Sequence, residues 1–156
     1  MLLRGLIDED FVNYKIPSMF LITPFCTFKC DKESGCAVCQ NSSIVKQPII
    51  EVSNESLIKR YEANPISKAI VVGGLEPFDS TDLETFIRDF RAKHSDTLVI
   101  YSGYEKTEVV EKFRWIYDFH NMVIKYGRFV PNAKHRFDEI LGIELQSDNQ
   151  FAEKYE

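Results

Sequence analysis

Residues 69–74 read Ala-Ile-Val-Val-Gly-Gly, a short and uninterrupted apolar run that ends at two glycines. A run of this length, bounded by a turn signal, is typical of a strand that is buried on both faces. Comparable runs occupy residues 19–23, 97–101 and 121–125, and each is followed closely by proline or glycine. The chain therefore contains four candidate strands of the kind found inside a parallel sheet.

Segments with helical periodicity separate these strands. Ser53 or Asn54 provides a cap for a helix that runs to about Tyr61. Residues 81–84 read Thr-Asp-Leu-Glu, a capping box that opens a second helix, and Thr107 opens a third. The apolar stripe expected along this third helix consists of Val109, Val110, Phe113, Ile116 and Tyr117. Strands that alternate with helices predict βαβ units, and thus an α/β fold with a mainly parallel sheet.

The composition is that of a globular protein. Of the 156 residues, 44% are hydrophobic and 28% are charged, which excludes a disordered chain. Lys and Arg number 19 against 24 Asp and Glu, so the net charge is −5 and nucleic acid is not an expected ligand. No apolar run approaches the roughly 18 residues that cross a bilayer, and the N-terminus lacks the layout of a signal peptide. We expect a single cytoplasmic domain over residues 1–156, without a membrane partner.

All four cysteines lie between positions 26 and 39: Cys26, Cys30, Cys36 and Cys39. Disulfides among them would only tie one loop to itself, so we expect reduced thiols. Four thiolates could close a structural zinc site, which has no open coordination position. Alternatively, three of them could hold an iron–sulfur cluster and leave one iron open to an external ligand. The spacing of the cysteines leaves both interpretations open, together with a third in which the thiols bind no metal.

Unusual residues follow three of the predicted strands. The cysteines come after the first strand, Gly73-Gly74 ends the second, and Ser102-Gly103 follows the third. Because ligands of parallel α/β proteins bind beyond the carboxyl ends of the strands, we expect these loops to converge on one site. A purely structural zinc site would not require this convergence, so the arrangement favours the iron–sulfur interpretation.

The cysteine loop resembles that of radical S-adenosylmethionine enzymes, in which a Cys-x-x-x-Cys-x-x-Cys motif holds a four-iron, four-sulfur cluster. Cys26 and Cys30 match its first interval, and Cys39 precedes Gln40-Asn41 where the family often has His-Asn. The resemblance implies that Cys26, Cys30 and Cys39 are the three ligands, with Cys36 as an alternative third ligand.

This loop departs from the family's motif in three ways. Eight residues separate Cys30 from Cys39, Val38 stands where the family has an aromatic residue, and Gln40 replaces the histidine. If Cys36 were the third ligand, the interval would be five residues. We favour Cys39, because the pair that follows it continues the family's pattern.

The second loop resembles the Gly-Gly-Glu-Pro motif, which binds the amino group of S-adenosylmethionine in the same family. Residues 73–77 read Gly-Gly-Leu-Glu-Pro, so Leu75 is inserted before the glutamate. The resemblance implies that Gly73, Gly74 and Glu76 hold the amino group, which suits glycine's small size and a carboxylate's ability to accept from ammonium. The other implied cofactor contacts are Val38 and Gln40 near the adenine, and Ser102 at the carboxylate or ribose.

Three further parts of the chain resemble the activating enzymes of anaerobic ribonucleotide reductase: residues 101–104, residues 123–129, and Gly142 with residues 147–150. That resemblance implies reductive cleavage of S-adenosylmethionine to a 5′-deoxyadenosyl radical, with an electron from a donor such as flavodoxin or ferredoxin. The radical would generate a glycyl radical on the catalytic subunit of an anaerobic (class III) reductase. Since a full barrel needs about 250 residues, we expect a minimal, open partial (β/α) barrel of the radical S-adenosylmethionine type.

Two other functions stay open from the sequence. One is an activase or radical enzyme that acts on another glycyl-radical protein. The other is a non-catalytic interaction module that binds zinc through all four cysteines. A local basic cluster of an otherwise acidic chain is predicted to be a solvated face or a docking surface for an acidic partner. This cluster consists of Lys125, Arg128, Lys134, His135 and Arg136.

Overall fold

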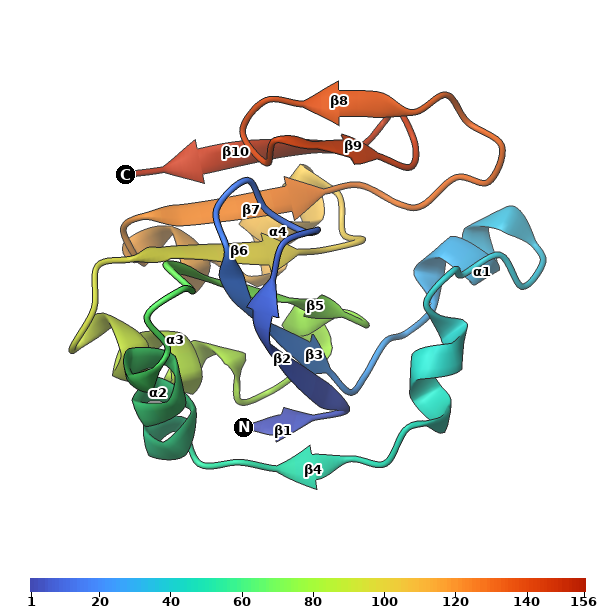
Figure 1. Ribbon diagram of the computed structural model, residues 1–156. Helices are drawn as coiled ribbons and strands as arrows, with labels where there is room; N and C mark the ends of the chain where they lie inside the picture. The colour runs from blue at the N-terminus through green and yellow to red at the C-terminus, as the bar shows by residue number, and fades with distance from the viewer.

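The computed structural model describes residues 1–156 and is built around one six-stranded sheet with the order β10-β7-β6-β5-β3-β2 (Figure 1). Its four central strands are parallel: β3 (Ser18–Thr23), β5 (Ala69–Gly74), β6 (Thr97–Tyr101) and β7 (Met122–Tyr126). Its two edges pair antiparallel to their neighbours: β2 (Gly5–Asp10) and β10 (Phe151–Tyr155). The expected α/β fold with a mainly parallel sheet is confirmed, and the sheet stays open rather than closing into a barrel.

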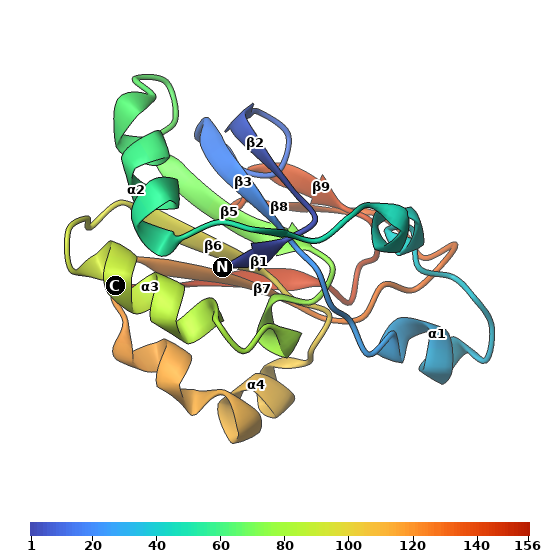
Figure 2. The same cartoon turned by 90° about the horizontal axis from the view of Figure 1, so that it is seen from below.

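Three helices connect the parallel strands: α2 (Asn54–Ala63), α3 (Leu83–Arg91) and α4 (Lys106–Lys112). Figure 2 shows all three on the same face of the sheet. The reason is topological, because the four parallel strands follow chain order without reversal and right-handed crossovers then stay on one side. This face holds the larger core, in which Leu21, Val72 and Ile100 of the sheet pack with Phe86 and Ile87 of α3.

The other face of the sheet is covered without helices. Val71, Val99 and Val123 point to this side and pack with Leu141 and Leu145. These last two residues belong to a C-terminal hairpin of two strands, β8 (Arg136–Asp138) and β9 (Ile143–Leu145). The strands are therefore buried on both faces, as their apolar runs predict, but by different kinds of structure.

The helix starts agree only in part with the predicted caps. Ser53 caps α2 as expected, since its Oγ accepts from the backbone N–H of Ser56 at 3.1 Å. The capping box predicted at residues 81–84 is wrong. Asp82 is the N-cap of α3 and makes no cap bond with its side chain, because its Oδ2 accepts from the N–H of Leu2 at 2.7 Å instead. A tertiary contact has displaced the local one.

The third predicted helix is shorter than expected. Helix α4 begins at Lys106 behind a capping box of Glu105 and Glu108, and it ends at Lys112. A second short segment, the 3₁₀ helix η3 (Arg114–Asp118), follows after Phe113 leaves helical geometry. The predicted continuous stripe is therefore broken, and Val110 is 46% exposed.

The segment between β3 and β5 also contains short elements at the periphery. These are α1 (Lys29–Ser34), the 3₁₀ helix η1 (Ser42–Lys46) and β4 (Ile50–Glu51), which pairs with β1 (Leu2–Leu3). In Figure 1 the arrowheads of β6 and β7 point toward α1, which carries part of the cysteine loop. A further 3₁₀ turn, η2 (Pro77–Asp79), follows β5. None of the helices has the length and apolar character needed to cross a bilayer.

Candidate functional site

A cavity of about 670 Å³ lies at the carboxyl ends of the parallel strands. Residues from all three predicted loops line it, among them Cys30 after β3, Gly74 at the end of β5 and Ser102 after β6. Its volume is in the range of small-molecule sites, and its wall mixes apolar and polar groups. The structure therefore brings together the three loops that the sequence expects to converge.

The four cysteines divide into three and one. Cys26, Cys30 and Cys39 are partly buried and line the cavity, whereas Cys36 is exposed and does not. The Cys36 Sγ lies 3.9 Å from both Ser34 O and Ser34 Oγ, within its own loop. No three or more His, Cys, Asp or Glu side chains are grouped closely enough to hold a single metal ion. The four thiols are thus not arranged as a closed tetrahedral site.

The donor set on the cavity wall fits an iron–sulfur cluster. Cysteine thiolates are the usual ligands of iron–sulfur clusters. A four-iron cluster is larger than a single metal ion, so its ligands lie farther apart. Burial raises the pKa of the Cys26 thiol to about 12 and also raises the pKa of Cys39. Because a thiol must lose its proton to become a ligand, the binding of a metal or cluster by these residues would be coupled to proton release.

Asp31 explains how a long interval still returns the third thiol to the cavity. Its Oδ1 accepts from the backbone N–H groups of Val38 and Cys39, both at 2.8 Å. These two hydrogen bonds hold residues 38 and 39 against α1. The helix ends at Gly35, which has a left-handed backbone conformation. The extra residues form an outward bulge that carries Cys36, and they leave Cys39 at the cavity. The spacing of the cysteines does not indicate these hydrogen bonds.

The two residues beside Cys39 lie differently. Gln40 lines the cavity, as its predicted contact with the adenine requires. Val38 does not line it, and its backbone N–H is bonded to Asp31. Any influence of Val38 on a ligand would therefore pass through the position of the loop.

The two glycines at the end of β5 have separate roles. Gly74 lines the cavity with a φ of 88°, and an added Cβ would lie 2.5 Å from Ile22 Cγ2, so no other residue fits without movement. Gly73 is not on the cavity wall. A Cβ there would lie 3.1 Å from Tyr101 Cβ, so Gly73 permits close packing within the sheet. The inserted Leu75 is buried and lines the cavity.

Glu76 joins the loop after β5 to the loop after β6. Its Oε1 accepts from Phe78 N at 3.1 Å and Ser102 Oγ at 2.9 Å, while its Oε2 accepts from Gly103 N at 2.8 Å. The residue is 5% exposed, and this burial raises its pKa to about 7. A carboxylate can accept about four hydrogen bonds, so the group can still take one from a ligand. Ser102 lines the cavity, but its hydroxyl is already bonded to Glu76 and Tyr104 N.

The prediction of a solvated basic cluster is wrong for two of its members. Lys125 is 7% exposed and lines the cavity, where its Nζ donates to Ser102 O at 3.2 Å and to Gly127 O at 3.0 Å. Burial lowers its pKa to about 8. Arg128 is buried as well. The available signal was the position of Lys125 inside the apolar run of β7, which places it within the sheet.

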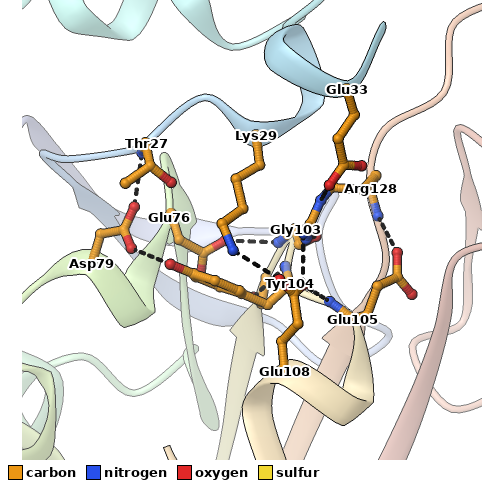
Figure 3. A network of polar contacts seen from close by, with 11 residues as sticks. Thr27, Lys29, Glu33, Glu76, Asp79, Gly103, Tyr104, Glu105, Glu108 and Arg128 are labelled. Carbon is orange, nitrogen blue, oxygen red and sulfur yellow. Dashed lines mark hydrogen bonds and ion pairs between the residues drawn. The ribbon is translucent and has the colours of Figure 1, made fainter. Parts of the chain in front are cut away.

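Arg128 belongs to a polar network that holds α1 over the strand ends (Figure 3). It pairs with Glu33 at 3.0 Å and Glu108 at 2.6 Å, and it donates to the Gly103 carbonyl. Glu108 also pairs with Lys29 at 2.7 Å. Because Lys29 and Glu33 stand near opposite ends of α1, the network fixes the helix at two points.

The closing segment of the chain supports the same side of the cavity. Asn149 Nδ2 donates to Arg128 O at 3.0 Å, and Gln150 Nε2 donates to Gly127 O at 3.3 Å. Gly127 adopts a φ of 101°, and an added Cβ would lie 3.2 Å from the Asn149 carbonyl oxygen. Gln150 and residues 143–146 of the hairpin complete the wall.

No family model matches the chain, and searches of curated proteins and of solved structures return no match.

Proposed function

We propose that this protein is an iron–sulfur enzyme that cleaves S-adenosylmethionine reductively and generates a glycyl radical on an anaerobic (class III) ribonucleotide reductase. The observation that carries the proposal is the placement of Cys26, Cys30 and Cys39 on one cavity wall that also bears Glu76. The exposed position of Cys36 supports three ligands rather than a zinc site made of all four cysteines.

The fold supports the same proposal. An open sheet whose parallel strands run in chain order, with every connecting helix on one face, suits a minimal partial barrel of the radical S-adenosylmethionine type. The cavity lies at the carboxyl ends of these strands, where such folds bind their ligands.

In this proposal, Cys26, Cys30 and Cys39 hold a four-iron, four-sulfur cluster. When bound, the cluster supplies one electron to S-adenosylmethionine, which yields methionine and a 5′-deoxyadenosyl radical. The protein binds and orients the cofactor and keeps water from the radical. Gly74 gives the backbone room for close approach, and Glu76 accepts from the ammonium group.

The cavity wall contains aromatic and amide residues that can bind the purine of the cofactor. Phe20 and Tyr101 line the cavity, as does Gln40. Aromatic faces stack on bases, and an amide side chain can hydrogen-bond to their edges. Tyr101 is fixed by a hydrogen bond from its hydroxyl to Asn13 O, at 2.5 Å.

A protein substrate agrees with the exposure of the cavity rim. Val12 lines the cavity and is exposed, and the neighbouring Phe11 is exposed too. Exposed apolar side chains beside a binding cavity suit a partner that covers them on docking. The glycine of the reductase would enter from this side and lose a hydrogen atom to the 5′-deoxyadenosyl radical, which forms 5′-deoxyadenosine and a glycyl radical.

The test uses anaerobically reconstituted protein, a reductant and S-adenosylmethionine, with and without the catalytic subunit of an anaerobic reductase. We expect 5′-deoxyadenosine and methionine in both samples, and an electron paramagnetic resonance signal of an oxygen-sensitive glycyl radical only when the reductase is present. Cleavage without that signal would point to another glycyl-radical partner. Stoichiometric zinc and no cleavage would overturn the proposal.

A further inference from the structure

A buried carboxylate and a buried ammonium group share the wall of the cavity. Glu76 is 5% exposed and Lys125 is 7% exposed, and both line the cavity. They flank the same residue, since Glu76 Oε1 bonds to Ser102 Oγ at 2.9 Å and Lys125 Nζ bonds to Ser102 O at 3.2 Å. Charged side chains are rarely buried unless they are paired, so this placement calls for an explanation.

Lys125 has bonding capacity that the protein does not use. An ammonium group has three donors, and the two hydrogen bonds of Lys125 both go to backbone carbonyls, of Ser102 and Gly127. These acceptors are neutral, and none of the ion pairs in the structure includes Lys125. One donor and the positive charge are therefore left for a ligand in the cavity.

Ser102 is poorly placed to bind the carboxylate of the cofactor, which is one of the roles that the sequence resemblance implies for it. Its hydroxyl proton goes to Glu76, and the same oxygen accepts from Tyr104 N at 2.9 Å. Binding a carboxylate through this hydroxyl would require breaking its bond to Glu76. Of the groups that line the cavity, Lys125 is the only one with a positive charge.

We propose that Lys125 binds the carboxylate of an α-amino acid moiety whose ammonium group lies at Glu76, so that the cavity selects a zwitterionic ligand. This inference rests on the proposed function, in which the moiety is the methionine part of S-adenosylmethionine. Charge-assisted hydrogen bonds at both ends fix its orientation. A site built in this way discriminates strongly against an analogue that lacks one of the groups, because a buried partner is then left unpaired.

The test is the binding of two probes to the anaerobically reconstituted protein: S-adenosylmethionine and its decarboxylated analogue. The variant is Lys125→Met, which keeps a long side chain and removes the charge. The control is Lys93→Met, an exposed lysine near the end of α3. We expect Lys125→Met to weaken S-adenosylmethionine by about 10-fold or more and to leave the analogue nearly unchanged. The control should change neither affinity.

A second pair of variants keeps the result independent of a folding defect. Lys125→Gln retains an N–H donor toward the carbonyls of Ser102 and Gly127 without a charge, and Lys125→Arg retains the charge. The glutamine variant should lose the preference for the carboxylate, and the arginine variant should keep part of it. Equal weakening of both probes, or no change for either, would overturn the role of Lys125 while wild-type cleavage still upheld the proposed function. If the wild-type protein binds neither probe, both proposals fail.

Discussion

Asp31 determines where the third cavity thiol lies, because one carboxylate oxygen holds the N–H groups of both Val38 and Cys39. Hydrogen bonds to a charged group contribute about 1.5–3 kcal/mol each. We expect Asp31→Ala to release this segment and lower the iron content of the reconstituted protein, with faster amide exchange at residues 38 and 39. Asp31→Asn retains an acceptor and should preserve most of the iron. Unchanged iron in Asp31→Ala would contradict this role.

Glu76 makes the stability of the cluster-free protein depend on pH. Burial raises its pKa in the folded state to about 7 from an ordinary 4.5, so the folded protein holds a proton that the unfolded chain releases. The contribution of Glu76 to the free energy of unfolding is therefore fully present below its ordinary pKa and is lost as the pH rises through about 7. The loss amounts to about 3 kcal/mol at most.

Glu76→Gln provides the measurement, since glutamine does not titrate. In urea unfolding between about pH 5 and about pH 8, the wild-type protein should lose stability relative to the variant as the pH rises. A constant difference across this range would mean that Glu76 does not titrate in the folded state.

At single positions, the sequence supports prediction where a residue's role is local. Gly74 can be predicted, because a strand that ends at glycine implies a tight backbone turn there. The burial of Lys125 can be predicted only in part. Its position in the apolar run of β7 places it within the sheet, but a lysine near a strand end is solvated or covered according to what packs above it. Residues 143–146 of the hairpin and Gln150 of the closing segment, which come later in the chain, line the same cavity as Lys125.

Among the elements, α1 is the one most dependent on charge. It has no buried residue and is held through Lys29, Glu33 and their partners Glu108 and Arg128. Burial acts to raise the pKa of Glu108, but hydrogen bonds from Lys29 and from its other partners outweigh it and hold the pKa at about 2. The carboxylate therefore stays ionised at any pH near neutrality, and α1 is fixed by electrostatics rather than by a core.

Glu108→Gln tests this dependence. The variant removes the charge that Lys29 and Arg128 share, and we expect it to destabilise the docked loop by about 1–3 kcal/mol. Amide exchange should accelerate in residues 26–39, and iron should be lost faster than from the wild-type protein. Glu84→Gln is the matched control, because its pair with Arg88 at 2.8 Å lies on the exposed side of α3. Equal exchange in both variants would show that the network does not hold α1.

The parallel strands could be predicted closely because their apolar runs are local and end at glycine or proline. The predicted cap at residues 81–84 was wrong because Asp82 bonds to Leu2, a contact that sequence periodicity does not contain. The sequence does not predict helix α1 or the hairpin of β8 and β9, since both are held by partners distant in the chain.

In the whole molecule, the unreversed order of the parallel strands places the connecting helices and the cavity in different parts of the protein. All connecting helices cover one face, and the cavity lies at the strand ends between the cysteine loop and the C-terminal hairpin. The α/β class and the convergence of three loops follow from the order of apolar runs and motifs. The hairpin that covers the second face cannot be predicted in this way, because short exposed strands have a weak sequence pattern.

The division of the cysteines is tested most directly by comparing Cys36→Ser with Cys39→Ser after anaerobic reconstitution. Iron and sulfide per chain are measured, and then the 5′-deoxyadenosine formed on reduction with S-adenosylmethionine. Cys36→Ser should retain about four irons and cleavage close to that of the wild-type protein, while Cys39→Ser should lose both. A cluster that survives Cys39→Ser and is abolished by Cys36→Ser would contradict the three-thiol site.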